Sequence, residues 1–141
     1  FSLSKEDKIV HVEIFENNLF VGSKNGWIYI YKLKNNKLSY INRIIAHKYD
    51  ITEMYFNNNT IFSSGSDGTF TITPINIENK KNKEQNRILI QLASNNYINS
   101  IRTIDTEREK YVLTVDKKGR LIYWNFDIEY LFKYIKKNIK N

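Results

Sequence analysis

Short apolar runs alternate with polar clusters along almost the whole chain. Runs rich in Ile, Val, Tyr, Phe and Thr are separated by groups of Asn, Gly, Asp and Lys, such as Lys24-Asn25-Gly26 and Ser66-Asp67-Gly68. This alternation predicts many short strands joined by tight turns, because β-branched and aromatic residues favour strands while Gly, Asn and Asp favour turns. We therefore expect an all-β fold up to about residue 126.

The pattern occurs three times, which points to an internal repeat. Each copy has three apolar runs with a glycine turn between the second and the third, at Gly26, Gly68 and Gly119. Gly68 follows Gly26 by 42 residues and Gly119 follows Gly68 by 51, and we attribute the longer spacing to a polar insert at 79–86. The expected strands are 9–15, 19–23 and 27–33; 51–56, 60–64 and 69–75; and 98–104, 111–115 and 120–126, with outer strands at 38–45 and 87–92.

Three motifs within these repeats resemble the WD40 family of β-propeller proteins. Ala46-His47 stands where the family's Gly-His opens a repeat, residues 63–68 resemble its Ser-Gly-Ser-Asp-Gly turn, and Trp124-Asn125 stands where Trp-Asp closes one. The aligned closing positions are Tyr31-Lys32 and Thr73-Pro74, so no repeat carries the full set. The resemblance implies an all-β partial WD40-type propeller with three four-stranded antiparallel blades, at about 1–46, 47–93 and 94–126.

The resemblance also implies structural roles for several polar residues and for the turn glycines Gly26, Gly68 and Gly119. In the family, an opening His, a Ser before the turn, the turn Asp and the closing Trp form a hydrogen-bonded chain that ties a blade together. His47, Ser64 and Asp67 match three of these members in the second repeat, and Asp116 and Trp124 match two in the third. We interpret His47 and Asp67 as structural and not as a catalytic pair, since no nucleophile or oxyanion site accompanies them.

Three blades are too few to close a propeller, which needs about four to eight. Both end sheets would be left with bare apolar faces. The remaining blades are expected from another part of a parent chain, from a partner or from self-association. The start at Phe1 without Met favours the first of these, because it indicates a fragment of a larger protein.

Composition removes several kinds of chemistry from consideration. The 141-residue chain has no Cys and only two His, which leaves no disulfide framework and too few ligands for a typical metal site, so we expect no cofactor. It has no apolar stretch of transmembrane length and no signal-peptide layout at its N-terminus, which predicts an intracellular protein, cytoplasmic or nuclear. The net charge of +7 favours acidic partners, although frequent Asn, Lys and Ile also fit an AT-rich genome, as in some protozoan parasites.

The pattern changes at residue 127. Apolar residues at helical spacing alternate with lysines up to residue 141, which predicts a basic amphipathic tail. It is expected either as a helix packed on the propeller or as the outer strand of the last blade, from Tyr130 to Ile135. The functional alternative is that the tail binds an anionic membrane surface or docks in a groove of a partner protein. The lysines available for such contacts are Lys133, Lys136, Lys137 and Lys140.

The leading hypothesis for function is an intracellular WD40 scaffold that binds protein partners and has no small-molecule substrate. Members of the family bind mostly through rim loops, which here contain the candidate contact residues Lys48, Tyr49, Asp50, Tyr97 and Lys117. The alternative is a subunit of a ribonucleoprotein assembly, such as one in ribosome biogenesis, that contacts RNA through lysine-rich loops and the tail. Membrane recruitment by the tail ranks below both. We expect no enzyme, because the chain has no P-loop, nucleophile elbow or cluster of carboxylates with His.

Overall fold

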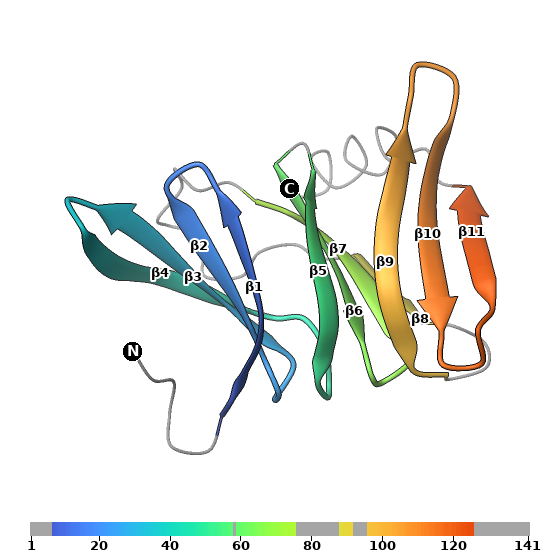
Figure 1. Cartoon of the computed structure of the whole chain (residues 1–141), viewed down its shortest axis with the longest axis horizontal. Coiled ribbons are helices and arrows are strands. Elements are labelled where there is room, and N and C mark those ends of the chain that lie inside the picture. Colours follow the sequence, from blue (N-terminus) through green and yellow to red (C-terminus); the bar gives the residue numbers. More distant parts are fainter. Residues whose placement is uncertain (1–6, 58, 76–87, 92–95, 126–141) are drawn as a thin grey trace, which may run out of the picture.

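The computed structural model describes residues 7–57, 59–75, 88–91 and 96–125, and these residues form three separate antiparallel sheets (Figure 1). No helix occurs among them, so the all-β prediction is confirmed. The first sheet contains β1 (Ile9–Phe15), β2 (Asn18–Ser23), β3 (Trp27–Lys34) and β4 (Lys37–Ile45); the second contains β5 (Ile51–Asn57), β6 (Thr60–Gly65), β7 (Thr69–Pro74) and β8 (Ile88–Gln91); and the third contains β9 (Ile98–Asp105), β10 (Lys110–Asp116) and β11 (Leu121–Asn125).

Strands within each sheet follow one another in chain order. Within the described residues, the predicted strands agree with the observed ones to within one residue at each end. The third sheet has three strands in the described part of the chain, where four were expected. The fourth strand and the alternative helix were both predicted within 127–141, which lies outside the described residues.

The register of the strands makes the repeat unambiguous. Ile9 pairs with Ser23, Ile51 with Gly65 and Ile98 with Asp116, and each pair adjoins a β-bulge. The three turns close alike, because the N–H of Gly26, Gly68 or Gly119 donates to the carbonyl three residues earlier. We call residues of different sheets equivalent when they lie the same number of positions from the paired residue Ile9, Ile51 or Ile98, from its partner Ser23, Gly65 or Asp116, or from the turn glycine of their own sheet.

The longer spacing between Gly68 and Gly119 has two sources, not one. Ile51 pairs with the residue 14 positions later, whereas Ile98 pairs with the residue 18 positions later, so the β9–β10 hairpin is four residues longer. The polar insert at 79–86 therefore accounts for only part of the nine extra residues between the glycines. The β9–β10 hairpin extends beyond the other hairpins at its edge in Figure 1.

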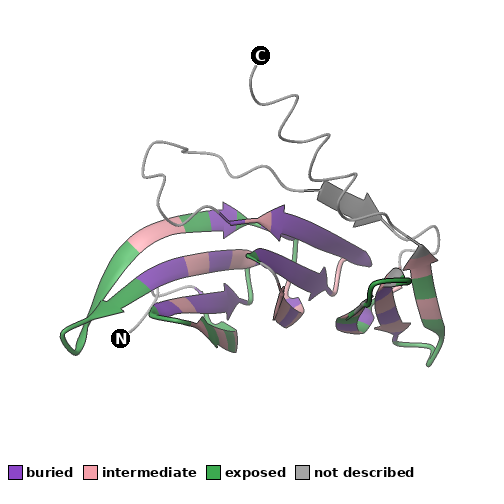
Figure 2. Ribbon diagram, turned by 90° about the horizontal axis from the view of Figure 1, so that it is seen from above, coloured by how far each residue is buried: buried purple, intermediate pink, exposed green. Residues whose placement is uncertain are grey.

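The apolar core lies between the sheets, in two layers. Between the first and second sheets the fully buried side chains include Phe20, Ile28 and Met54; between the second and third they include Phe62, Phe70 and Ile101. Each fully buried residue of this size contributes about 1.5–3 kcal/mol to stability. The second sheet is covered on both faces, and every residue of β6 is buried (Figure 2). The sheets do not close into a ring, and the outer faces of the first and third remain open.

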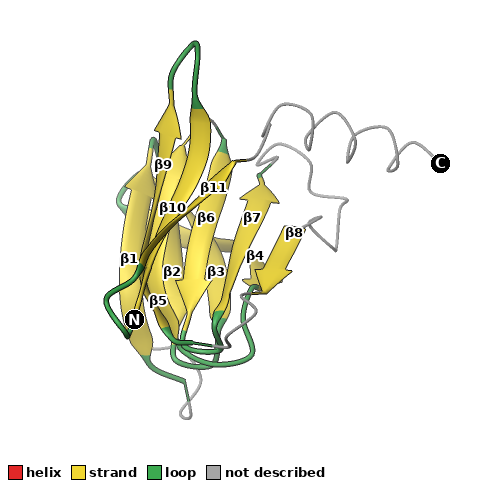
Figure 3. Ribbon diagram, turned by 90° about the vertical axis from the view of Figure 1, so that its right-hand side faces the viewer, coloured by secondary structure: helices red, strands yellow, loops and turns green. Residues whose placement is uncertain are grey.

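The glycine turns between β2 and β3, β6 and β7, and β10 and β11 lie at one edge of the array (Figures 1 and 3). We call this the glycine-turn edge. Gly26, Gly68 and Gly119 have φ of 83°, 78° and 77°, a region that side chains rarely adopt. The connections that lead into β5 and β9 reach the same edge, since Ser66 N–H donates to Asp50 C=O and Lys117 N–H donates to Tyr97 C=O. Asp50 and Tyr97 therefore lie at the glycine-turn edge.

Candidate binding cleft at the glycine-turn edge

A buried network centred on His47 holds the connection between the first two sheets. His47 Nδ1 lies 2.9 Å from Thr69 Oγ1 and 3.3 Å from Asp67 Oδ1, and Nε2 lies 2.8 Å from Ser63 Oγ. Ser63 continues the network to Thr71. Both ring nitrogens therefore have partners inside the protein, and the imidazole is not presented to a ligand.

The structure places Ser63 in this network, whereas the resemblance to WD40 repeats predicted Ser64. Neighbouring residues of a strand point to opposite faces. Ser63 therefore faces His47, while the Ser64 hydroxyl bonds the Thr52 hydroxyl at 2.8 Å. Thr114 is the equivalent of Ser63 in the third sheet, where it accepts a hydrogen bond from Trp124 Nε1 at 3.2 Å. The indole of Trp124 is therefore bonded to a residue of the neighbouring strand β10.

Gly65 is required by the position of His47. A Cβ at this residue would lie 2.5 Å from His47 Nδ1 and 2.6 Å from Asp67 Oδ1. Its equivalents in the other sheets, Ser23 and Asp116, carry side chains that accept the N–H of Trp27 and Arg120 respectively. In the second sheet Asp67 provides that oxygen instead, accepting Thr69 N–H at 3.0 Å.

Asp67 connects the β6–β7 turn to the chain segment before β5. Its Oδ2 accepts Lys48 N–H at 2.9 Å, and its Oδ1 accepts the Thr69 hydroxyl at 2.7 Å. Burial acts to raise the pKa of this carboxyl, but the bonds from His47, Thr69 and Lys48 outweigh it and hold the pKa well below its ordinary value. Asp67 therefore stays ionised and fixes the position of Lys48.

Asp116 has a different role from Asp67, although both were matched to the family's turn Asp. Asp116 is equivalent to Gly65, two places earlier in the turn, and contacts its own hairpin. Its Oδ2 accepts Arg120 Nε at 2.7 Å, and its Oδ1 accepts Lys118 N–H at 3.0 Å. Burial favours a higher pKa for Asp116, yet its bonds to Arg120 and Lys118 lower the pKa.

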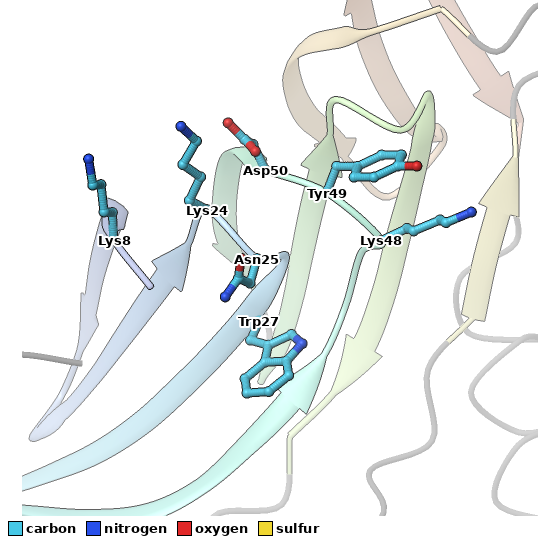
Figure 4. A pocket seen from close by; sticks show the side chains of 7 residues that line it. All are labelled: Lys8, Lys24, Asn25, Trp27, Lys48, Tyr49 and Asp50. Atoms are coloured by element: carbon cyan, nitrogen blue, oxygen red, sulfur yellow. The ribbon is translucent and has the colours of Figure 1, made fainter. Parts of the chain in front are cut away.

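A cleft of about 590 Å³ opens at the glycine-turn edge between the first two sheets (Figure 4). Its residues come from the segment just before β1, from the β2–β3 turn, from the first residue of β3 and from the connection between β4 and β5. The lining residues are Lys8, Lys24, Asn25, Trp27, Lys48, Tyr49 and Asp50.

The walls of the cleft are held by backbone contacts around Gly26. Its carbonyl accepts Ala46 N–H at 3.1 Å and His47 N–H at 2.9 Å, and a Cβ on Gly26 would collide with the carbonyl of His47. Lys24 N–H donates to Lys8 C=O at 2.8 Å. These bonds join the turn to both chain segments that line the cleft, so its shape is set by main-chain geometry.

Buried Asp7 supports the same wall. Its Oδ1 accepts Lys8 N–H at 2.9 Å and Asn25 N–H at 3.1 Å, and its Oδ2 accepts the Tyr29 hydroxyl at 3.1 Å. Burial first, and then the hydrogen bond to Asp7, raise the pKa of Tyr29 to about 12. The Tyr29 phenol therefore stays uncharged to a higher pH than an ordinary tyrosine does.

The cleft has a positive charge and two aromatic side chains. Lys8, Lys24 and Lys48 are exposed and make no ion pair with a described residue, whereas Asp50 provides a single carboxylate. The Arg43 guanidinium lies 4.2 Å from the centre of the Trp27 ring, and Lys48 Nζ lies 5.6 Å from that of Tyr49. In Figure 4 the side chains of Lys8 and Lys24 point in similar directions, that of Lys48 points to the other side next to Tyr49, and Trp27 lies below Asn25.

The structure brings together three of the five residues predicted to contact partners. Lys48, Tyr49 and Asp50 line the cleft, while Tyr97 and Lys117 lie beside each other on the third sheet, with Lys117 Nζ 5.9 Å from the Tyr97 ring. Lys8, Asn25 and Trp27 were not identified as site residues from the sequence. The repeat contains a signal for Lys8, because it is equivalent to Asp50 and Tyr97, which stood among the rim candidates.

Other predicted features give no second site in the described residues. No group of three or more His, Asp or Glu side chains there is arranged to hold a metal ion. No helix within the same part of the chain is long and apolar enough to cross a membrane. Lys133, Lys136, Lys137 and Lys140 lie outside the described residues.

Comparisons with known proteins support the fold alone. No family model and no curated protein matches the chain. Among solved structures it is similar to the computationally designed protein Ika4, with a TM-score of 0.64 and 16% identity over 84% of this chain. The designed protein Ika8 gives the same TM-score with 15% identity, again over 84% of this chain. The match spans 66% of Ika4 but only 33% of Ika8.

Proposed function

We propose that this chain is part of a WD40-type propeller and serves as a protein-interaction module that binds an acidic segment of its partner in the glycine-turn cleft. The observation that carries the proposal is that Lys8, Lys24, Lys48 and Trp27 all line one cleft. A repeated array of sheets provides a rigid frame for such a site, and rim loops on a rigid frame commonly carry binding residues.

The composition of the cleft fits an extended acidic peptide. Three exposed lysines against the single carboxylate of Asp50 favour carboxylate side chains in the ligand. Tyr49 is exposed beside Lys48 and offers an amphipathic surface of the kind that anchors protein interfaces. The equivalent turn of the second sheet carries Ser66 and Asp67 where the first carries Lys24 and Asn25, so the second turn lacks this basic character, whereas the third turn shares it through Lys117 and Lys118.

RNA binding is the second candidate, supported by the same three lysines. Single-stranded nucleic acid binds strongly where bases stack on open aromatic faces. Here the Arg43 guanidinium lies over the Trp27 ring, which leaves less of that ring for stacking. The geometry therefore supports a protein ligand better than RNA.

Fluorescence anisotropy with a labelled peptide rich in Glu and Asp tests the proposal. The double variant Lys24→Glu/Lys48→Glu should lose most of the binding. Lys34→Glu/Lys37→Glu, an equal charge change at the two strand ends that flank the β3–β4 turn, should retain it. Equal loss in both variants would show attraction to overall charge and contradict a specific cleft.

A parallel titration with labelled oligouridine distinguishes the second candidate. Binding through phosphate contacts weakens steeply between about 50 and 200 mM salt. Tight, salt-sensitive binding of oligouridine together with no binding of the acidic peptide would replace the protein-interaction proposal by RNA binding.

A further inference from the structure

The two open faces of the array are of different kinds. Each sheet has a leading face, which points toward the next sheet along the chain, and a trailing face, which points toward the previous one. The first sheet exposes its trailing face and the third exposes its leading face. The two contacts between neighbouring sheets, which we call the internal junctions, each join a leading face to a trailing face. The residues buried in them show which side chains each kind of face packs against.

The open trailing face of the first sheet keeps the apolar residues that are buried in the other two sheets. Val12 is equivalent to Met54 and Ile101, which are buried against the preceding sheet. Ile14 is equivalent to Phe56, and Leu33 is equivalent to Ile75; the same junction contains Phe56 and Ile75. Ile14 is 69% exposed, so an apolar position used in the first junction is left uncovered.

The open leading face of the third sheet shows the same relation. Leu121 is equivalent to Ile28 and Phe70, which are fully buried against the following sheet. Tyr123 is equivalent to Ile30 and Ile72, which occupy the same two junctions. Leu121 and Tyr123 are nevertheless 66% and 70% exposed, because the described chain provides no further sheet to cover them.

We propose that copies of this chain associate head to tail, with the leading face of the third sheet of one copy packed on the trailing face of the first sheet of another. The internal junctions are the established interface that this contact continues. An open leading face of one copy can pack on an open trailing face of another copy in the same way that neighbouring sheets pack within one copy. Two open faces of the same kind lack this complementarity, so the association is heterologous.

The test uses two variants of the full chain, each with one face blocked. Leu121→Lys/Tyr123→Glu blocks the leading face, and Val12→Lys/Ile14→Glu blocks the trailing face; Tyr49→Lys, at an exposed aromatic outside both faces, is the control. Multi-angle light scattering should give an assembly for the wild type and the control, and a monomer for each blocked variant. An equimolar mixture of the blocked variants should form a dimer, because one intact leading face and one intact trailing face remain.

The mixture separates loss of association from loss of folding, since a misfolded variant would not restore the dimer. A wild-type chain that stays monomeric at about 100 µM contradicts the proposal. Either blocked variant that still dimerises alone shows that like faces pair, which also overturns it. A blocked pair that remains monomeric when mixed, although each variant keeps a β-sheet circular dichroism spectrum, does the same.

Discussion

Single residues at the glycine-turn edge show how one repeat pattern is adapted to different neighbours. Ser23, Gly65 and Asp116 are equivalent, yet the first accepts the Trp27 N–H, the second makes room for His47, and the third holds Arg120. The choice at each turn follows from the chain segment packed beside it. The His47 ring occupies the space that a side chain at residue 65 would need.

Replacing Gly65 by Ala should destabilise the fold by about 1–3 kcal/mol, the usual cost of forcing an extra group into a packed interior. The new methyl group would collide with the His47 ring. In a His47→Ala background the same change should cost less, because the ring is gone and the remaining close contact, at 2.6 Å, is with the end of the Asp67 side chain. Urea unfolding of the four proteins in this cycle measures the coupling, and additive effects would contradict the steric explanation.

Gly119 provides a contrasting case, because its constraint is conformational. A Cβ there would meet nothing within 4 Å, but its φ of 77° lies in the left-handed region. Gly119→Ala should therefore cost about 1–2 kcal/mol. Gly119→Asn should cost less, because Asn tolerates this region better than Ala. Equal midpoints of urea unfolding for the two variants would show that backbone strain does not set the cost.

The lowered pKa of Asp67 predicts how stability depends on acid. The folded protein binds a proton at this carboxyl less readily than the unfolded chain does, so its contribution is complete above the ordinary carboxyl pKa of about 4 and declines as the pH falls below it. Asp67→Asn should lower stability at neutral pH and make the acid limb less steep. Ser66→Ala, a non-titrating change next to it, should leave that limb unaltered when unfolding is followed from pH 7 to pH 2.

At this edge the residue types are visible in the sequence, whereas their contacts depend on the fold. His47 and Asp67 were matched to structural roles, and both lie in the buried network. Ser64 was predicted where the structure has Ser63, because two adjacent serines differ only in the face of the sheet that they occupy. That face depends on strand register. Asp116 was aligned by residue type, whereas its position is set by hydrogen bonds that only the folded turn reveals.

At the scale of elements, the strands were predictable because their signals are local. Alternating apolar residues and turn glycines specify each hairpin without knowledge of the rest of the molecule. The cleft was only partly predictable, since Lys8, Trp27 and Tyr49 come from separate segments that meet when the first two sheets pack. The sequence of a single repeat does not reveal which of its residues contact the neighbouring sheet.

Glu53 illustrates such a contact, because it joins β5 to β9 across the second junction. Its carboxylate accepts the Ser100 hydroxyl and, at 2.9 Å, the Ile101 N–H, and it lies 2.6 Å from Arg102 Nη1. Burial opposes ionisation of Glu53, but these bonds prevail and lower its pKa. The second and third sheets are therefore joined by charge-assisted hydrogen bonds as well as by apolar packing.

Glu53→Ala should destabilise the protein by about 1–3 kcal/mol, because hydrogen bonds to a charged group are lost and the Ile101 N–H is left without its acceptor. Glu53→Gln keeps an oxygen acceptor and should cost less. Glu13→Ala, on β1, is the control, because its contact is a 3.7 Å approach to His11 and surface changes usually stay within about 0.5 kcal/mol. Similar unfolding midpoints for Glu53→Ala and Glu13→Ala would show that the bridge adds nothing to stability.

At the scale of the whole molecule, burial is distributed unevenly among the three sheets. The second sheet is covered on both faces, and β6 and β7 are buried along almost their whole length. The first and third sheets each have one covered face, and most of β4 is exposed. Because local opening costs more where more apolar contacts must break, stability should be highest at the centre of the array and lowest at its ends.

Amide hydrogen exchange can test both the difference in local stability between the central and end sheets and the proposed head-to-tail contact. In dilute protein, amides of β6 and β7 should exchange slowest, and those of β1, β4 and β11 faster. In concentrated protein, association should cover the outer faces of the end sheets, so exchange in β1 and β11 should slow while exchange in β6 stays nearly the same. The variant Leu121→Lys/Tyr123→Glu removes one of the two faces that every contact requires, so its exchange should not depend on concentration. Protection that rises with concentration equally in all strands would indicate nonspecific aggregation, and end sheets that exchange as slowly as β6 in dilute protein would contradict the difference in local stability.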